Sequence, residues 1–159
     1  MPGKEVISVY TKEFLETLKQ QEAALQYDAF DYEDAYRLGT KLREEGMKGV
    51  QPVAVRVVLE DLIVYQSFPK GTTAENGAWM DRKYATVMHT HTSSLRAAVE
   101  REMFGCTEAW QQDEVAHAFC GGAFPIVVNG AFVGVAIVSG LPHLEDHDLL
   151  VRVLKMDIS

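Results

Sequence analysis

The five histidines are the side chains of this sequence with the widest chemical range, because imidazole titrates near neutral pH and binds metal ions. His89 and His91 are two residues apart, a spacing that on a helix directs the rings about 200° apart, so this pair cannot share one ion. His143 and His147 are four residues apart and would share one helix face, but no third ligand stands at the spacing of a zinc site. The sequence therefore predicts no metal site.

Two of these histidines fit a structural role. His91 follows the apolar spacing of Met88 on the expected helix, which favours a packed side chain with one hydrogen-bonded nitrogen. His147 follows the apolar stripe of the final helix, and Asp146 beside it is placed to stabilise the helix start through the dipole. His143 is expected at or just before that start.

Three other groups could contact a ligand. Gly121-Gly122 precedes a strand and could let backbone amides approach a ligand, although a tight turn into the sheet also explains the pair. Basic residues form a stripe at Arg82-Lys83, Arg96 and Arg101. Ion pairs with neighbouring acidic residues account for this stripe, but binding of an anionic ligand stays open as an alternative. Ser93-Ser94 lies between Lys83 and Arg96 in the chain and in no nucleophile elbow, so acyl-transfer chemistry is unsupported. No residue is assigned a catalytic role.

Composition narrows the class of protein. The chain has 159 residues, of which 47% are apolar, enough to bury a sizeable core without disulfides or metal. Its 15 Lys and Arg against 23 Asp and Glu give a net charge of -8, which argues against nucleic acid as a partner. No stretch is apolar enough to predict a membrane span or a secretory signal, and two cysteines cannot form a disulfide framework. These features predict a cytoplasmic protein.

Apolar residues at three- and four-residue spacing, together with helix caps, predict several helices. Asp31 can cap the second helix, and Thr72 begins a Thr-x-x-Glu capping box for the third. The weak helix formers around Thr92 predict a break in this long helical stretch. The expected helices cover residues 9–25, 31–46, 72–103 with that break, 108–117, and the chain after Pro142.

Two β-hairpins are expected among these helices. Strands 53–59 and 62–68 meet at Glu60-Asp61, and strands 124–128 and 131–138 meet at Asn129-Gly130, the strongest hairpin turn in the sequence. The apolar run 131–138 is typical of a central strand covered on both faces. The pattern predicts an α+β domain with one mainly antiparallel sheet between helices, and a short strand over 26–30 would make five strands.

Several short blocks stand in a specific order along the chain. They are Lys70–Trp79, Arg82-Lys83, Thr86-Val87, Ser93–Leu95, Gly121–Ile126, Val138–Pro142 and Asp146-His147. In this order they resemble the GlcG/HbpS-like haem-degrading family, and within it the uncharacterised cytosolic branch found in bacteria and fungi. The match runs from about residue 30 to the C-terminus, so the helix within residues 1–25 is an N-terminal addition.

The resemblance implies a profilin-like three-layer α/β/α fold with a five-stranded antiparallel sheet, and assembly of copies into symmetric homo-oligomers. It also implies haem as a ligand to be tested, because other branches of the family bind haem. The candidate iron ligands are then His91, His143 and His147.

We therefore expect residues 1–159 to form one cytoplasmic, homo-oligomeric domain of this family that binds a small molecule or serves as a scaffold for a protein partner. The expected pocket lies between protomers near Arg82-Lys83, Ser93-Ser94 and Gly121-Gly122. Two alternatives stay open. One is a haem-binding or haem-degrading protein. The other is an enzyme acting on a small anionic metabolite, held by Arg82 or Lys83, with Asp146 or His147 transferring a proton.

Overall fold

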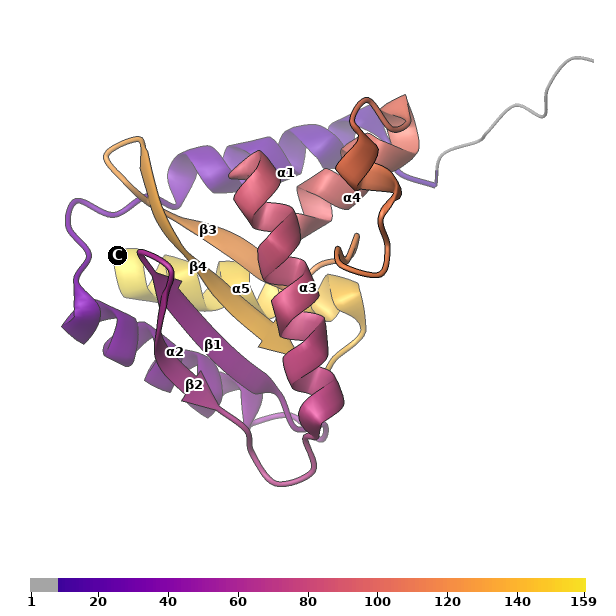
Figure 1. Cartoon of the computed structure of the whole chain (residues 1–159). Coiled ribbons are helices and arrows are strands. Elements are labelled where there is room, and N and C mark those ends of the chain that lie inside the picture. The colour runs from indigo at the N-terminus through magenta and orange to yellow at the C-terminus, as the bar shows by residue number, and fades with distance from the viewer. Residues whose placement is uncertain (1–8) are drawn as a thin grey trace, which may run out of the picture.

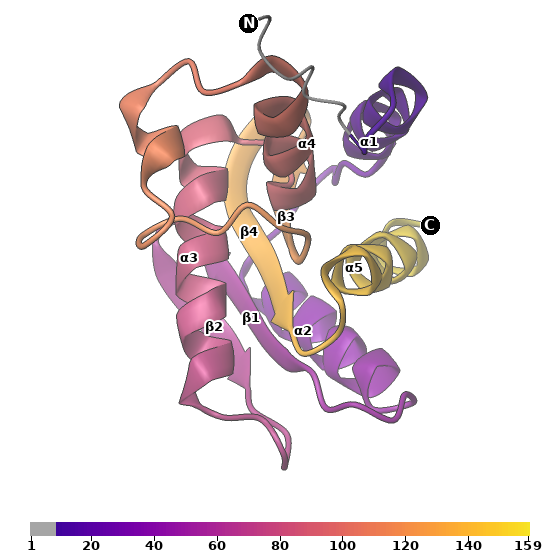
Figure 2. The ribbon, with the colours of Figure 1, turned by 90° about the vertical axis from the view of Figure 1, so that its right-hand side faces the viewer.

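The computed structural model describes residues 9–159 and has an α+β fold in three layers (Figures 1 and 2). One antiparallel sheet lies in the middle. Helices α2 and α5 cover one face, α3 covers the other, and α1 packs beside α4 at one end of the molecule. The elements are α1 (Lys12–Ala24), α2 (Tyr32–Gly46), β1 (Ala54–Leu59), β2 (Leu62–Ser67), α3 (Ala74–Thr90), α4 (Ser94–Phe104), the 3-10 helix η1 (Ala109–Gln112), β3 (Ala123–Val128), β4 (Ala131–Ser139) and α5 (His143–Ile158).

The sheet has four strands in the order β2-β1-β4-β3, so the prediction of five strands was wrong. The expected strand over 26–30 is reduced to Tyr27, which forms an isolated bridge with Val128. The Tyr27 N–H donates to Val127 O at 2.8 Å, and Asn129 N–H donates to Tyr27 O at 3.0 Å. Pairing stops there because Asp31, four residues later, already caps α2 through Asp34 N–H.

Both predicted hairpins are confirmed, and they pair with each other through β1 and β4. Asn129 and Gly130 have φ of 48° and 84°, and Glu60 and Asp61 have φ of 52° and 63°. A two-residue turn with positive φ at both positions matches the right-handed twist of the strands. The Glu60-Asp61 pair adopts this turn although it is not the Asn-Gly pair that such turns prefer.

Successive side chains along each strand point to opposite faces of the sheet, so the apolar core is divided between the two faces. Val55 and Val57 of β1 face α2 and α5, where they meet Phe124 and the apolar side of α5. Val58 and Ile137 belong to a smaller cluster on the other face, under α3. The central strand β1 and most of β4 are therefore buried on both sides, as the apolar character of β4 predicted, whereas the edge strand β2 is largely exposed.

The predicted break in the long helix is confirmed, but its surroundings differ from the prediction. Helix α3 ends at Thr90, His91 takes the left-handed conformation with φ of 57°, and Ser93 caps α4. The N-cap of α3 is Thr73 rather than Thr72, since Thr73 Oγ1 accepts the Glu75 N–H. The helix expected over 108–117 is only the short η1.

No helix within residues 9–159 combines the length and the apolar character that crossing a bilayer requires. The expected first helix corresponds to α1, and residues 1–8 of the predicted N-terminal addition lie outside the described residues.

Candidate functional site

A pocket of about 390 Å³ opens where the first half of α3 meets the end of β4 and the start of α5. Each of these elements presents polar side chains to the pocket, and Trp79 and Leu141 add apolar surface. Its lining residues are Glu75, Asn76, Trp79, Lys83, Cys120, Ser139, Gly140, Leu141, His143 and Asp146.

A buried ion pair between α3 and α5 forms part of the pocket wall. Lys83 Nζ donates to Asp146 Oδ2 at 3.2 Å and to Val138 O at 2.9 Å, and both charged side chains are 3% exposed. Asp146 Oδ1 accepts the Leu141 N–H at 3.1 Å. Burial raises the pKa of Asp146, whereas the ammonium of Lys83 opposes this rise. Lys83 was predicted on a basic stripe; the structure buries it instead.

The two consecutive glycines make the approach of α3 and α5 to the sheet feasible. Gly122 has φ of 128°, and a Cβ there would overlap Lys83 Nζ. A Cβ on Gly121 would overlap the carbonyl oxygen of His143. Gly122 thus packs against Lys83 of α3, and Gly121 packs against the start of α5. The two glycines therefore do more than turn the chain into the sheet, because they let both helices approach it closely.

His143 is the first residue of α5 and presents a neutral ring to the pocket. Its Nδ1 accepts the Gly121 N–H at 3.1 Å. Burial, together with the ammonium of Lys83, lowers the pKa of His143, so the ring is uncharged at neutral pH. Because Nδ1 is an acceptor, the single proton of the neutral ring lies on Nε2. His143 therefore offers an N–H donor, a pattern known from neutral catalytic histidines at helix starts.

His147 lies one turn further along α5 and has a structural position. Its ring is 2% exposed, and Nε2 donates to Gln21 Oε1 at 2.8 Å, which ties α5 to α1. Burial lowers the pKa of His147 to about 4. Its Nδ1 is buried without a hydrogen-bond partner among the described residues. The prediction that His147 packs on the apolar stripe is confirmed.

Cys120 lines the pocket as a free thiol. Burial raises the pKa of this thiol, which leaves it protonated and poorly nucleophilic at neutral pH. Asn76 is fixed by donating to the backbone and hydroxyl oxygens of Ser139 at 3.2 and 3.3 Å. These groups shape the pocket, and neither one supplies a nucleophile.

The remaining predicted residues lie elsewhere. Ser93 accepts the Arg96 N–H as the cap of α4, and Ser94 Oγ accepts the Ala123 N–H at 3.0 Å, so both hydroxyls hold the fold together. Arg82 lies over the Trp79 ring, outside the set that lines the pocket.

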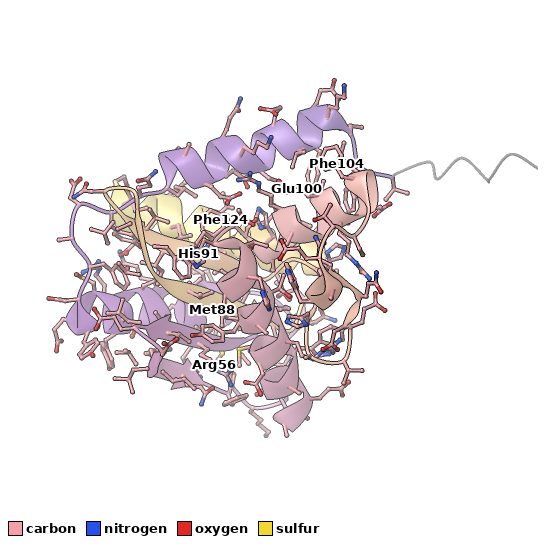
Figure 3. The ribbon with its side chains drawn as sticks, turned by 45° about the horizontal axis from the view of Figure 1, so that its top comes forward. Arg56, Met88, His91, Glu100, Phe104 and Phe124 are labelled. Carbon is pink, nitrogen blue, oxygen red and sulfur yellow. The ribbon has the colours of Figure 1, made fainter. Side chains whose placement is uncertain are left out.

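His91 lies where α3 ends, beyond Met88 on the same helix (Figure 3). Its position is about 12 Å further along the helix axis than that of Lys83. The ring is exposed and stacks on Phe132 at 4.0 Å, so the prediction of a packed histidine was wrong. The prediction relied on the apolar spacing, which continues through His91 in the sequence. Helix α3 ends just before this residue, however, and the left-handed backbone of His91 leaves its side chain exposed.

Sequence reasoning named Lys83, Gly122 and Asp146, and the structure brings these three together. It missed Asn76, Trp79 and the Ser139–Leu141 segment as parts of the pocket. The sequence could have indicated these residues, because they belong to the ordered blocks Lys70–Trp79 and Val138–Pro142 that carry the family resemblance.

Within residues 9–159, no group of three or more His, Cys, Asp or Glu side chains is arranged to hold a metal ion.

Comparison with known proteins identifies the family. The family model "Haem degrading protein HbpS-like" matches residues 30–155. A UPF0303 protein of Brucella melitensis is 36% identical over 146 residues, which cover 89% of this chain and 85% of the relative. The crystal structure of the Ybr137w protein matches with a TM-score of 0.80 at 27% identity, over 91% of this chain and 87% of that one. PduOC, solved as a haem complex, matches in fold with a TM-score of 0.70 at 15% identity, over 82% and 96% of the two chains. As the ordered blocks predicted, the chain belongs to the HbpS-like family.

Proposed function

We propose that this chain is a cytosolic, homo-oligomeric protein that binds a small molecule in the pocket between α3, β4 and α5. The observation that carries the proposal is the Lys83–Asp146 ion pair in the wall of that pocket. Burying two charges costs several kcal/mol for each ion, and apolar side chains would stabilise this junction at least as well. A buried carboxylate whose pKa is raised, as that of Asp146 is, beside a pocket supports a functional site.

The polar groups define the ligand chemistry. His143 Nε2–H is a neutral donor, and Lys83 Nζ retains one proton beyond those that it donates to Val138 O and Asp146, with no acceptor for it among the described residues. Both groups suit an oxygen acceptor, such as a carbonyl or a carboxylate. Trp79 and Leu141 suit a small apolar body. The volume of 390 Å³ lies within the range of roughly 300–1,000 Å³ that ligand pockets occupy.

Proton transfer by Asp146 or His147 is not part of this proposal. Both oxygens of Asp146 already accept hydrogen bonds, from Lys83 and from Leu141 N–H. The ring of His147 is enclosed and bonded to Gln21. The groups therefore support holding a ligand better than they support acid–base chemistry.

Haem is the second candidate ligand, favoured by the family description and by the haem complex of PduOC. The residues of the pocket do not fit an iron site. His143 would need a lone pair on Nε2, but its Nδ1 accepts the Gly121 N–H and the neutral ring keeps its proton on Nε2. His147 has no free access, and the exposed His91 lies outside the pocket.

The test is a thermal-shift screen of carbonyl- and carboxylate-bearing metabolite pools, with haemin in a separate arm. A ligand at 100 times its Kd stabilises the folded chain by about 2.7 kcal/mol. The variant His143→Asn keeps an acceptor for Gly121 N–H and removes the Nε2–H donor. His91→Asn is the matched control outside the pocket. We expect a pool to raise the melting temperature of the wild type and of His91→Asn, and to raise it much less in His143→Asn.

Two outcomes would overturn the proposal. One is the absence of stabilisation by every pool. The other is a haemin Soret band that disappears when His143 is changed to Ala, which would make the pocket a haem site.

The cytosolic and oligomeric parts of the proposal have separate support. Cys106 and Cys120 are free thiols, which suits a reducing compartment. At the open edge of the sheet, the β2 residues Leu62 and Ile63 are exposed, and Tyr36 of α2 is 63% exposed. Exposed apolar edges are suited to contact between copies. Native mass spectrometry at micromolar concentration should show an assembly, and a spectrum of monomer alone would contradict this part.

A further inference from the structure

A second pocket, of about 250 Å³, lies beside the first. Trp79 and Cys120 line both pockets, so the two share a wall. The second pocket is enclosed by α3, α4 and the segment that leads from Asp113 to Cys120. The first pocket presents an ion pair and a neutral donor, whereas the second is lined by two arginines.

Both arginines lie over aromatic rings. The guanidinium carbon of Arg82 lies 4.4 Å from the centre of the Trp79 ring, and that of Arg101 lies 4.1 Å from the centre of the Phe119 ring. Stacking fixes the plane of a guanidinium while leaving its edge free to donate. The planar guanidinium of arginine can bind a carboxylate or a phosphate with two parallel hydrogen bonds.

The donors of Arg82 are incompletely used. Arg82 Nη2 donates to the backbone oxygen of Glu114 at 2.8 Å, while Arg82 Nε is buried with no hydrogen-bond partner among the described residues. An unpaired buried N–H of a cation is costly, and because this nitrogen is closed to solvent, a ligand oxygen would reach the guanidinium at its Nη atoms. Arg101 Nη1 donates to Glu114 Oε1 at 2.9 Å.

The local charge also favours an anion. Glu114 is the sole carboxylate among the residues lining this pocket, and its side chain pairs with Arg101 alone, because Arg82 donates to its backbone oxygen. Its side chain is 67% exposed, whereas that of Arg101 is 25% exposed. An exposed ion pair of this kind contributes little, so an incoming oxyanion can replace the carboxylate without a large cost. The positive charge stands out on a chain whose net charge is -8.

We propose that the pocket formed by Arg82, Arg101 and Phe119 is an oxyanion subsite for a carboxylate or a phosphate. The inference rests on the proposed function and makes it more specific. The ligand would have two parts. An oxygen acceptor would bind at His143 and Lys83, and a separate anionic group would bind at the two arginines. The part of the ligand that joins them would lie over Trp79. The substrate class is therefore a small carboxylic acid or phosphate ester that carries a second oxygen function.

The test measures the binding of inorganic phosphate and of acetate as separate probes. Chloride replaces each anion at equal ionic strength, because screening by salt changes every exposed charge. Fluorescence of Trp79 in a Trp110→Phe background reports on the subsite, since these are the two tryptophans of the chain. Saturable quenching of Trp79 fluorescence by phosphate, by acetate or by both supports the subsite. The comparison of the two probes shows which oxyanion the subsite prefers.

Three variants distinguish a subsite from general attraction. Arg101→Gln should weaken the preferred anion about tenfold, because it removes a charged hydrogen bond worth more than 1.4 kcal/mol. Glu114→Gln should tighten binding roughly threefold by removing the internal competitor. Arg152→Gln makes the same change of charge on the exposed face of α5 and should leave the affinity unchanged. A merely structural role for Glu114 predicts no tightening.

Two results would overturn the inference. One is that neither anion is distinguished from chloride. The other is that Arg101→Gln and Glu114→Gln bind as the wild type does. The variant His143→Asn should still bind the simple anion, since it leaves the arginines intact. The two proposals can fail separately. If the arginines bind the simple anion but no metabolite pool stabilises the chain, the proposed function fails and the subsite stands.

Discussion

Removing the negative charge of Asp146 should destabilise the fold far more than a surface ion pair would. The substitution Asp146→Asn keeps an oxygen that accepts the Leu141 N–H but leaves the ammonium of Lys83, 3% exposed, without a counter-charge. Breaking a buried pair by removing one partner costs about 3–5 kcal/mol. An exposed pair contributes about 0–1 kcal/mol.

The predicted loss is a large share of the stability of a single domain, which is about 5–15 kcal/mol. At about 2–4 °C per kcal/mol for a chain of this size, the melting temperature should fall by roughly 6–20 °C. Urea unfolding followed by circular dichroism measures the free energy, and an unchanged slope confirms that the unfolded state is comparable.

The matched control is the double variant Lys83→Met/Asp146→Asn, which removes both charges. It should recover more than half of the loss, because no charge stays buried without its partner. A loss below about 1 kcal/mol in Asp146→Asn, or a double variant at the sum of the two single losses, would refute the description of a buried, coupled pair.

Three further predictions concern individual residues. The pKa of His147 is about 4 in the folded chain against 6.5 for an ordinary histidine, so the stability that its neutral ring contributes is complete above pH 6.5 and is lost as the pH falls toward 4. His147→Gln should therefore flatten the pH dependence by about 3 kcal/mol in urea unfolding, and equal slopes in both proteins would contradict this. Gly122→Ala should cost about 1–3 kcal/mol through strain alone and more through overlap with Lys83, whereas Gly105→Ala, also at positive φ but with open space around it, isolates the strain. Asp157 is fully buried at the side chain and accepts from Arg37, so Asp157→Asn should lower the free energy of unfolding by about 1.5–3 kcal/mol, and an unchanged midpoint would disprove that role.

Local signals explain which parts of the fold could be predicted from the sequence. The turn at Asn129-Gly130 and the break near Thr92 depend on residues within a few positions of each other, and both are correct. The fifth strand failed because strand length depends on a distant partner. Tyr27 meets Val128 for a single bridge before the chain turns toward α2.

The site was predictable only in part for the same reason. The buried position of Lys83 depends on the close approach of α3 to Gly122, a contact between segments 39 positions apart in the chain. No local pattern distinguishes this lysine from an exposed one. The role of His143 depends on which nitrogen meets the Gly121 N–H, and that is set by the packing of the start of α5 on the sheet.

The most direct test of the central claim is calorimetric titration of a compound selected by the screen against three proteins. The wild type and His91→Asn should bind with the same affinity, and His143→Asn should bind at least about tenfold more weakly, because it has lost the Nε2–H donor at the pocket. Equal affinity in all three proteins would contradict the placement of the ligand between α3, β4 and α5.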